Sequence, residues 1–179
     1  MEVVVVDNSE KPKVEIEERT LFPIKLIWCD RKGAYAARNS GVKVASGAVL
    51  VFIDADCWPS ASWLSSGLDV LLSYNKAIVG GNVLFEKSLE PTAVELYQIL
   101  MGFGQEKSIK ELNFSATANL FVKRDVFDMV GYFNEQLLSG GDREWSWRAI
   151  RAGAEIYYAK NAVVWTLPRR TLRCYNSSS

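Results

Sequence analysis

The stretch from Val49 to Ile53 constrains the fold of this chain more than any other segment. Five consecutive apolar residues are typical of a strand that is buried on both faces, at the centre of an α/β domain. The run ends at Asp54-Ala55-Asp56, which places two carboxylates at the carboxyl end of the predicted strand. In open α/β sheets, ligands bind beyond the carboxyl ends of the strands. The sequence therefore predicts an acidic ligand site at the end of a central strand.

Strand and helix patterns alternate along the rest of the chain. Residues 102–108 fit neither pattern and are predicted to form a loop. The alternation favours an α/β fold, a three-layer α/β/α sandwich with a mostly parallel central sheet. Besides 49–53, strands are predicted at 3–6, 24–28, 77–79, 117–122, 155–159 and 162–165, and helices at 33–46, 59–74, 92–101, 125–130 and 142–152.

The composition excludes several classes of protein. Hydrophobic residues make up 49% of the 179 residues, which is too many for a disordered chain. Because 21 basic residues balance 21 acidic ones, we expect no nucleic-acid partner. The absence of histidine excludes Ser-His-Asp triads and histidine-based zinc chemistry.

The location of the protein is predicted from its cysteines and its apolar segments. Three widely spaced cysteines indicate neither a disulfide framework nor a zinc ribbon. No basic leader precedes the short valine run at the start, and no apolar stretch approaches the ~20 residues that cross a bilayer. We therefore expect a cytoplasmic protein. The basic tail at Arg169, Arg170 and Arg173 is either a solvated terminus or a contact with the inner face of the membrane or with a lipid-linked acceptor.

The Asp54-Ala55-Asp56 segment predicts a metal site. Two fixed carboxylates at the end of a strand suit a hard divalent cation, Mg²⁺ or Mn²⁺, whose shell is completed by water and substrate phosphates. The substrate is therefore predicted to carry phosphate. The competing interpretation is an aspartate turn in which Asp56 caps a helix that begins at Pro59.

Asp142 is a second candidate for chemistry. It follows Gly140 and Gly141, which leave space for a ligand, and a carboxylate held at a helix start can accept a proton from a substrate hydroxyl. The alternative is a helix N-cap without chemistry. The neighbouring Trp145 and Trp147 favour a site that faces sugar, although both fit a hydrophobic core, Trp147 above all.

Two further polar residues follow or precede predicted strands. Asp7 ends the first strand, where it would either bind a nucleobase or close a local turn with Asn8 and Ser9. Arg38 lies on the helix before the metal strand, where it would neutralise phosphate, stack on a base or remain solvated.

Taken together, these segments resemble the family 2 glycosyltransferases. The resemblance covers residues 2–166 and rests on the order of its pieces: Gly33 to Gly41, Ala45 to Gly47, Val51 to Cys57, Trp63-Leu64, Thr117 to Phe127, Gly131 to Glu135 and Gly140 to Arg148. It implies a GT-A catalytic domain over residues 2–167, followed by a flexible basic and serine-rich tail over 168–179. The activity it implies is inverting, metal-dependent transfer of a sugar from a nucleotide-diphosphate donor to a hydroxyl of a saccharide or lipid-linked acceptor.

The resemblance also implies a role for each matched position. Asp54 and Asp56 match the family's D-x-D motif, which binds the metal and the diphosphate, and Asp56 is expected to coordinate most directly. Asp7 matches the residue that contacts the base, Arg38 one near the nucleotide, and Asp142 the catalytic base. The matched positions on the acceptor side are Asn119, Glu144 and Trp145.

Three departures from the family pattern stand out. The chain begins at what resembles the family's second strand, so the domain is expected to be incomplete at its N-terminus, with an exposed sheet edge that allows self-association. Gly141 replaces the glutamate of the family's E-D motif. Thr166 stands near the place where the family often has a histidine.

Three alternative functions are weighed against sugar transfer. Haloacid-dehalogenase phosphatases also begin with an apolar strand and D-x-D, but Cys57-Trp58-Pro59 does not match the residues that come after their motif, and Ser146 stands where their later aspartate is needed. Sugar-phosphate nucleotidyltransferases have an opening glycine-rich loop that is absent here. The third alternative is a truncated, inactive domain that binds a nucleotide-sugar or a protein partner.

Overall fold

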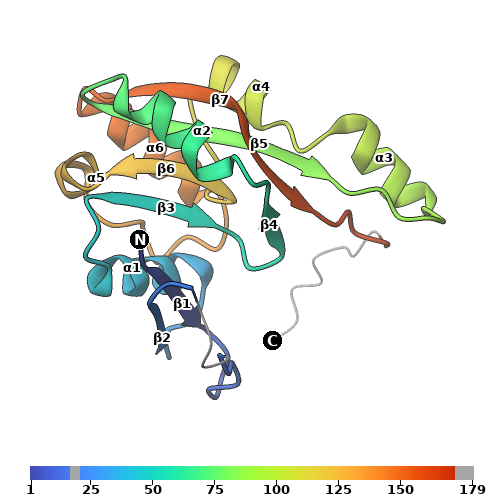
Figure 1. Ribbon diagram of the computed structural model, residues 1–179, viewed down its shortest axis with the longest axis horizontal. Helices are drawn as coiled ribbons and strands as arrows, with labels where there is room; N and C mark the ends of the chain where they lie inside the picture. Colours follow the sequence, from blue (N-terminus) through green and yellow to red (C-terminus); the bar gives the residue numbers. More distant parts are fainter. Residues whose placement is uncertain (17–20, 172–179) are drawn as a thin grey trace.

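The computed structural model describes residues 1–16 and 21–171 (Figure 1). Most of the predicted tail, residues 172–179, therefore lies outside the described residues. The elements in chain order are β1 (Val3–Asp7), β2 (Ile24–Trp28), α1 (Ala34–Val44), β3 (Val49–Ile53), β4 (Cys57–Pro59), α2 (Trp63–Leu72), β5 (Ala77–Phe85), α3 (Ala93–Met101), α4 (Gln105–Leu112), β6 (Asn119–Lys123), α5 (Arg124–Val130), α6 (Gly141–Arg151) and β7 (Glu155–Thr166).

The main sheet has five strands in the order β3-β6-β5-β7-β4. Only β5 and β7 pair in parallel, whereas β6 runs antiparallel to both of its neighbours and β4 runs antiparallel to β7. The prediction of a mostly parallel sheet is therefore wrong for this sheet. An apolar run such as that of β6 looks the same in either direction, so hydrophobic periodicity does not reveal strand orientation.

A separate two-stranded sheet is formed by β1 and β2, which pair in parallel. Figure 1 shows this small sheet lying beside α1, away from the five-stranded sheet. Neither β1 nor β2 pairs with any strand of the main sheet among the described residues.

Helices cover both faces of the main sheet, which confirms the predicted three layers. One core contains Leu120 and Val122 of β6 together with residues of α1, α5 and α6. The other contains Phe121 of β6 together with residues of α2 and β7. Successive side chains of a strand point to opposite faces, so β6 joins the two cores. Gly67 of α2 fits against the Phe121 ring, where a Cβ would lie 2.3 Å away.

Several element boundaries differ from the predictions. The predicted loop at 102–108 contains the first turn of α4, and the helix expected from Pro59 begins at Trp63 because Pro59 belongs to β4. The two strands expected at 155–159 and 162–165 form the single strand β7, whose register against β5 shifts between Gly81 and Asn82. None of the described helices is long and apolar enough to cross a membrane.

Candidate functional site

The carboxylates Asp54 and Asp56 lie on the turn between β3 and β4. The Asp54 carbonyl accepts a hydrogen bond from the Cys57 amide (3.0 Å), which closes the turn. Asp54 Oδ1 accepts a hydrogen bond from Arg38 Nη2 (2.8 Å), whereas the Asp56 side chain is exposed and forms no ion pair with any described residue. The helix-cap interpretation of Asp56 is wrong, because α2 begins only at Trp63.

The chemistry of this turn fits a hard divalent cation. Carboxylate oxygens are the ligands that Mg²⁺ and Mn²⁺ prefer, and Mg²⁺ is commonly held by one or two carboxylates while water and phosphate supply the rest. No group of three acidic or cysteine side chains able to hold a metal occurs among the described residues. Burial raises the pKa of the nearby Cys57 thiol to about 11.

Asp142 lies in the first turn of α6, and its two carboxylate oxygens differ in their environment. Asp142 Oδ2 accepts hydrogen bonds from the amide (3.1 Å) and the hydroxyl (3.2 Å) of Thr117. Asp142 Oδ1 is buried and has no hydrogen-bond partner. The N-cap of α6 is Gly140, and no side chain caps this helix, so the interpretation of Asp142 as an N-cap is wrong.

Helix α1 connects the Asp54 turn with the start of α6. The Tyr35 hydroxyl accepts a hydrogen bond from the Gly141 amide (2.8 Å) across a sequence separation of 106 residues. The Arg38 guanidinium, which binds Asp54, lies 5.6 Å from the centre of the Tyr35 ring. Burial, and then the negative charge of Asp142, raises the pKa of Tyr35. The predicted metal residue Asp54 and the predicted base Asp142 therefore both lie next to a single turn of α1.

Two of these supporting residues were not predicted to belong to the site. Tyr35 and Thr117 are buried, and each stood in the sequence as an ordinary member of a helix or strand segment. In the sequence, the only indication of their role in the site was that both lie inside segments that resemble the family. Periodicity carries no information about hydrogen bonds between such distant segments.

Asp7 is buried at the end of β1, and its carboxylate is bound by the loop that comes next in the chain. It accepts hydrogen bonds from the amides of Ser9 (2.9 Å), Lys13 (2.6 Å) and Val14 (3.0 Å). These bonds hold the pKa of Asp7 well below its usual range. The local-turn interpretation therefore accounts for its environment, and contact with a nucleobase stays a prediction.

A further polar cluster fixes the loop before α6. The Asn39 side chain exchanges two hydrogen bonds with the backbone of Phe133, through its amide (2.9 Å) and its carbonyl (3.0 Å), and also donates to Glu135 Oε1 (2.9 Å). Glu135 in turn forms an ion pair with Arg31. The hydrogen bond from Asn39 and the charge of Arg31 lower the pKa of Glu135. This cluster anchors α1 to the segment that precedes α6.

The three residues expected on the acceptor side do not line a common surface. Asn119 and Trp145 are fully buried, so the structure contradicts their assignment to an acceptor site. Trp145 stacks on Phe127, with ring centres 5.3 Å apart, and its indole donates to the Gly131 carbonyl. Glu144 is paired with Arg148 on α6, two residues and roughly 200° around the helix from Asp142. Glu144 therefore points away from the oxygen that Asp142 leaves free.

The two tryptophans of α6 exchange the environments that were expected for them. Trp147 was expected in the core and Trp145 on the acceptor side. Trp145 is the core residue, whereas Trp147 is 39% exposed and lies under the Arg143 guanidinium, 5.3 Å from its ring centre. Positions 145 and 147 lie on different faces of the helix, and only the packing of α5 on α6 decides which face is internal.

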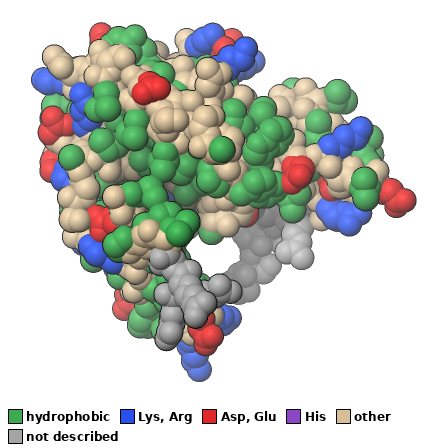
Figure 2. Space-filling view, viewed as in Figure 1, with side chains coloured by type: hydrophobic (Ala, Val, Ile, Leu, Met, Phe, Trp, Pro, Cys, Tyr) green, Lys and Arg blue, Asp and Glu red, His purple; other side chains and the backbone are tan. Residues whose placement is uncertain are grey.

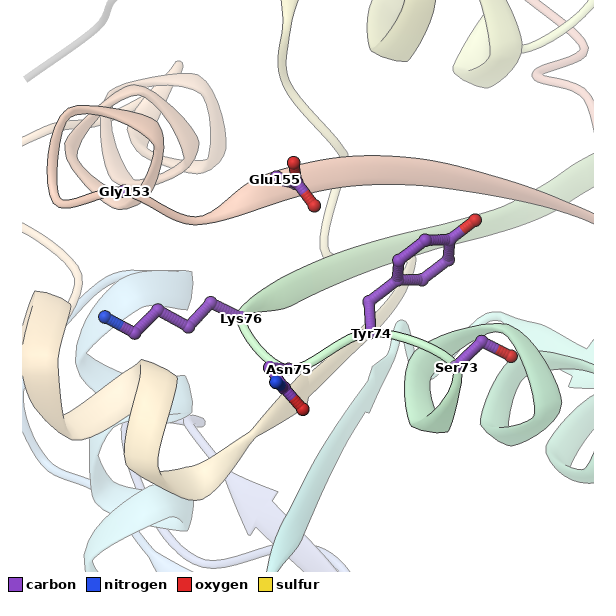
Figure 3. Close-up of a pocket in the computed structure, with 6 residues that line it drawn as sticks. All are labelled: Ser73, Tyr74, Asn75, Lys76, Gly153 and Glu155. Carbon is purple, nitrogen blue, oxygen red and sulfur yellow. The ribbon is translucent and has the colours of Figure 1, made fainter.

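A surface pocket lies at the opposite end of the sheet from these carboxylates. Figure 3 shows it between the end of α2 and the starts of β5 and β7, lined by Tyr74, Lys76 and Glu155 among others. Strands β3, β5 and β7 run in the same direction, so the starts of β5 and β7 are distant from the end of β3. The Tyr74 ring stacks on Tyr157 at 3.7 Å. None of the predicted site residues lines this pocket.

Comparisons with known proteins agree with the sequence pattern. The family model described as "Glycosyl transferase family 2" matches residues 1–133. Glycosyltransferase AglE of Haloferax volcanii is 37% identical over 167 residues, which cover 90% of this chain and 55% of that protein. The pre-mycofactocin glycosyltransferase of Mycobacterium tuberculosis is 28% identical over 173 residues, which cover 92% of this chain and 37% of that protein. The chain thus spans about half the length of the first relative and less of the second.

Solved structures show the same fold at low sequence identity. The S. aureus TarS 1-349 structure has a TM-score of 0.63 and 15% identity, and the match covers 93% of this chain and 51% of that one. The structure of GalNAc-T7 with UDP, GalNAc and Mn²⁺ has a TM-score of 0.59 and 17% identity, over 82% of this chain and 32% of that one.

Proposed function

This chain belongs to glycosyl transferase family 2, and we propose on that premise that it transfers a sugar from a nucleotide-diphosphate donor to an acceptor hydroxyl, with inversion. Its fold is the GT-A fold of the solved glycosyltransferases, as predicted. The proposal depends above all on one observation, the unpaired and buried Oδ1 atom of Asp142.

Asp142 is proposed to act as the general base. Thr117 holds Asp142 Oδ2 with two hydrogen bonds and so fixes the rotamer of the side chain, while Oδ1 has no hydrogen-bond partner within the protein. A buried oxygen without a partner is costly, and an acceptor hydroxyl would supply the missing hydrogen bond. Removal of the proton assists attack on the anomeric carbon from the face opposite the leaving diphosphate, which inverts that centre. Base assistance of this kind contributes typically 10²–10⁴-fold in rate.

Asp54, Asp56 and Arg38 are proposed to bind the donor diphosphate. A divalent cation held by Asp54 and Asp56 would offset negative charge on the diphosphate leaving group. Arg38 is pre-oriented by Asp54 and by the Tyr35 ring, and its planar guanidinium can exchange the carboxylate for phosphate oxygens. A chain of similar fold was solved with UDP and Mn²⁺, which supports this choice of ligands.

The acceptor and the location of the protein remain proposals. We infer that a saccharide or lipid-linked hydroxyl is the acceptor, and that the protein is cytoplasmic or peripheral to the membrane. Of the basic tail, Arg169 and Arg170 bind Gln98 and Glu95 of α3, and Arg173 lies outside the described residues.

The test compares Asp142→Asn with Asp128→Asn, a matched change at an exposed site on α5. A panel of nucleotide-sugars is first screened for binding by calorimetry in the presence of Mn²⁺, and transfer is then measured with the tightest donor. Asp142→Asn should lower kcat by ~10²-fold or more at unchanged donor Kd, because only the base is lost. Asp128→Asn should match the original protein. Turnover that survives in Asp142→Asn would remove Asp142 from the mechanism.

A second candidate is a domain that binds a nucleotide-sugar without turnover. The separation of β1 from the main sheet favours it, because Asp7 and the Asp54 turn then lie on two different sheets. Metal-dependent donor binding without transfer or hydrolysis by the original protein would support this candidate. Release of free phosphate from sugar phosphates would instead support a phosphatase.

A further inference from the structure

The turn from Ala116 to Asn119 carries Thr117, the residue that holds Asp142. The Asn119 amide donates to the Ala116 carbonyl (3.3 Å) and closes this turn just before β6. Thr117 is buried although it belongs to neither a helix nor a strand. Buried backbone groups outside regular structure need hydrogen-bond partners from other segments. The position of Thr117 therefore depends on what binds this turn.

The Gln105 side chain binds both ends of the turn. Gln105 is the first residue of α4 and is buried. Its Oε1 accepts a hydrogen bond from the Ala116 amide (3.1 Å). Its Nε2 donates to Ser115 Oγ (2.9 Å) and, over longer distances, to the carbonyls of Ala116 (3.3 Å) and Asn119 (3.4 Å). One side chain of α4 therefore fixes the backbone on either side of Thr117.

Helix α6 binds the same segment from the other side. The amide and the hydroxyl of Thr117 donate to Asp142 Oδ2, and the amide of Ser115 donates to Ser146 Oγ (3.3 Å). Residues four apart lie on one face of a helix, so Asp142 and the fully buried Ser146 both face the segment. The segment thus lies between Gln105 of α4 and the face of α6 that carries Asp142.

The packing of α4 leaves Gln105 little freedom. Gln105 and Ile109 form the buried side of this helix. A Cβ at Gly80 of β5 would lie 2.4 Å from both Ile109 Cδ1 and Ser115 Oγ, so the helix and the segment pack tightly against the sheet. The exposed side of α4 carries ion pairs between lysines and glutamates, and the charged side chains at the upper edge of Figure 2 lie where Figure 1 places α4. Gln105 is therefore a polar residue on an internal face, held there by its hydrogen bonds.

We propose that Gln105 is a positioning residue for sugar transfer, which holds Thr117 where its hydrogen bonds orient the Asp142 carboxylate. Gln105 acts through the turn and not on the carboxylate itself, and the proposal rests on the proposed role of Asp142 as the base. Without Gln105 the turn relaxes, Thr117 leaves Oδ2, and Oδ1 no longer keeps one direction. A misplacement of about 1 Å can cost about 10²-fold in rate. Donor binding should be unaffected, because Arg38 and Asp54 belong to α1 and to the turn after β3.

The first test follows hydrogen exchange residue by residue, by NMR on the full chain without any ligand. Gln105→Met keeps the length of the side chain and removes its donor and its acceptor. The Thr117 amide should then exchange about tenfold faster or more, while the amides of the central strand β6 keep their rates. Gln136→Met, the same change at an exposed site, should leave both unchanged. Unchanged exchange at Thr117 would overturn the proposal, and so would equal acceleration throughout β6, which means a general loss of stability.

The second test separates positioning from a purely structural role. Gln105→Met should lower kcat by about tenfold or more with the tightest donor of the nucleotide-sugar screen, while the Kd for UDP in the presence of Mn²⁺ stays unchanged. In the Asp142→Asn background, the same change should lower kcat no further, because Gln105 acts only through Asp142. An additive loss in that background, or an unchanged kcat in the single variant, would overturn the positioning role.

Failure of this proposal can be distinguished from failure of the proposed function. Full turnover in Asp142→Asn removes the base itself, and with it the role of Gln105. A large loss in Asp142→Asn together with unchanged kcat in Gln105→Met overturns the positioning role alone. Should Gln105→Met not fold, Gln105→Asn replaces it, because its amide is one methylene shorter and cannot bond to both ends of the turn. It should change Thr117 exchange and kcat in the same directions, and unchanged values of both would again overturn the proposal.

Discussion

Replacement of Asn119 by leucine distinguishes an interior role from the acceptor role that the sequence predicts. The Asn119 side chain accepts from Trp63 Nε1 (2.8 Å) and donates to the carbonyls of Asn82 (2.9 Å) and Ala162 (2.8 Å). The Ala162 carbonyl lies where β7 shifts register against β5, so Asn119 joins α2 to this irregularity. Close packing continues at Gly81, where a Cβ would lie 2.3 Å from Asn119 Nδ2.

The expected loss in the free energy of unfolding is the sum over these three hydrogen bonds. Leucine keeps the volume but leaves one donor and two acceptors without partners. A buried group left unsatisfied costs ~1–3 kcal/mol, so the sum for the three groups exposed by Asn119→Leu is ~3–9 kcal/mol. A domain of this size is stable by only ~5–15 kcal/mol, so the variant should unfold at a far lower urea concentration. Urea unfolding at 25 °C, followed by circular dichroism, measures the difference in the free energy of unfolding.

A matched change at the exposed Asn75 provides the control. Asn75→Ala should alter the free energy of unfolding by no more than ~0.5 kcal/mol, as most surface substitutions do. A loss below ~1 kcal/mol in Asn119→Leu, accompanied by a raised KM for the acceptor, would refute the interior role and restore the acceptor prediction.

Three further predictions concern the connection to α6, the pH dependence of stability and the packing of α2. Tyr35→Phe should leave the buried Gly141 amide without its acceptor and destabilise the protein by ~1–3 kcal/mol. It should also lower kcat more than it alters donor Kd. Unchanged transfer kinetics would contradict the proposal that Tyr35 positions the start of α6. Because the pKa of Asp7 is lowered in the folded state, its charged form contributes stability above the ordinary value of ~4, and this contribution is lost as the pH falls. The gap in unfolding free energy between the original protein and Asp7→Asn should therefore be widest near neutral pH and narrow in acid, and a constant gap from pH 7 to pH ~2 would contradict it. Gly67→Ala should destabilise the protein, because the alanine Cβ would lie 2.3 Å from the Phe121 ring and overpacking costs ~1–3 kcal/mol. This cost should exceed the ~1 kcal/mol by which alanine favours a helix over glycine, and a raised melting temperature would contradict the prediction.

Local chemistry made part of this protein predictable from its sequence. The apolar run of β3 followed by two aspartates predicted the strand and the acidic turn. Its predicted central place is wrong, because β3 is an edge strand of the five-stranded sheet and only Leu50 of it is buried. The helix at α3 was predicted as well, and the Thr92 and Glu95 side chains form the reciprocal cap that starts it. Such signals act within a few residues, and a single sequence displays them directly.

The tertiary structure alone decided which residues meet. Strand directions, the interior places of Asn119 and Trp145, and the bond between Tyr35 and Gly141 depend on segments far apart in the chain. A buried polar side chain must find a partner, but its residue type does not say whether the partner is a ligand or another part of the fold. For Asn119 the partners are internal, whereas one oxygen of Asp142 has none, and only packing distinguishes the two.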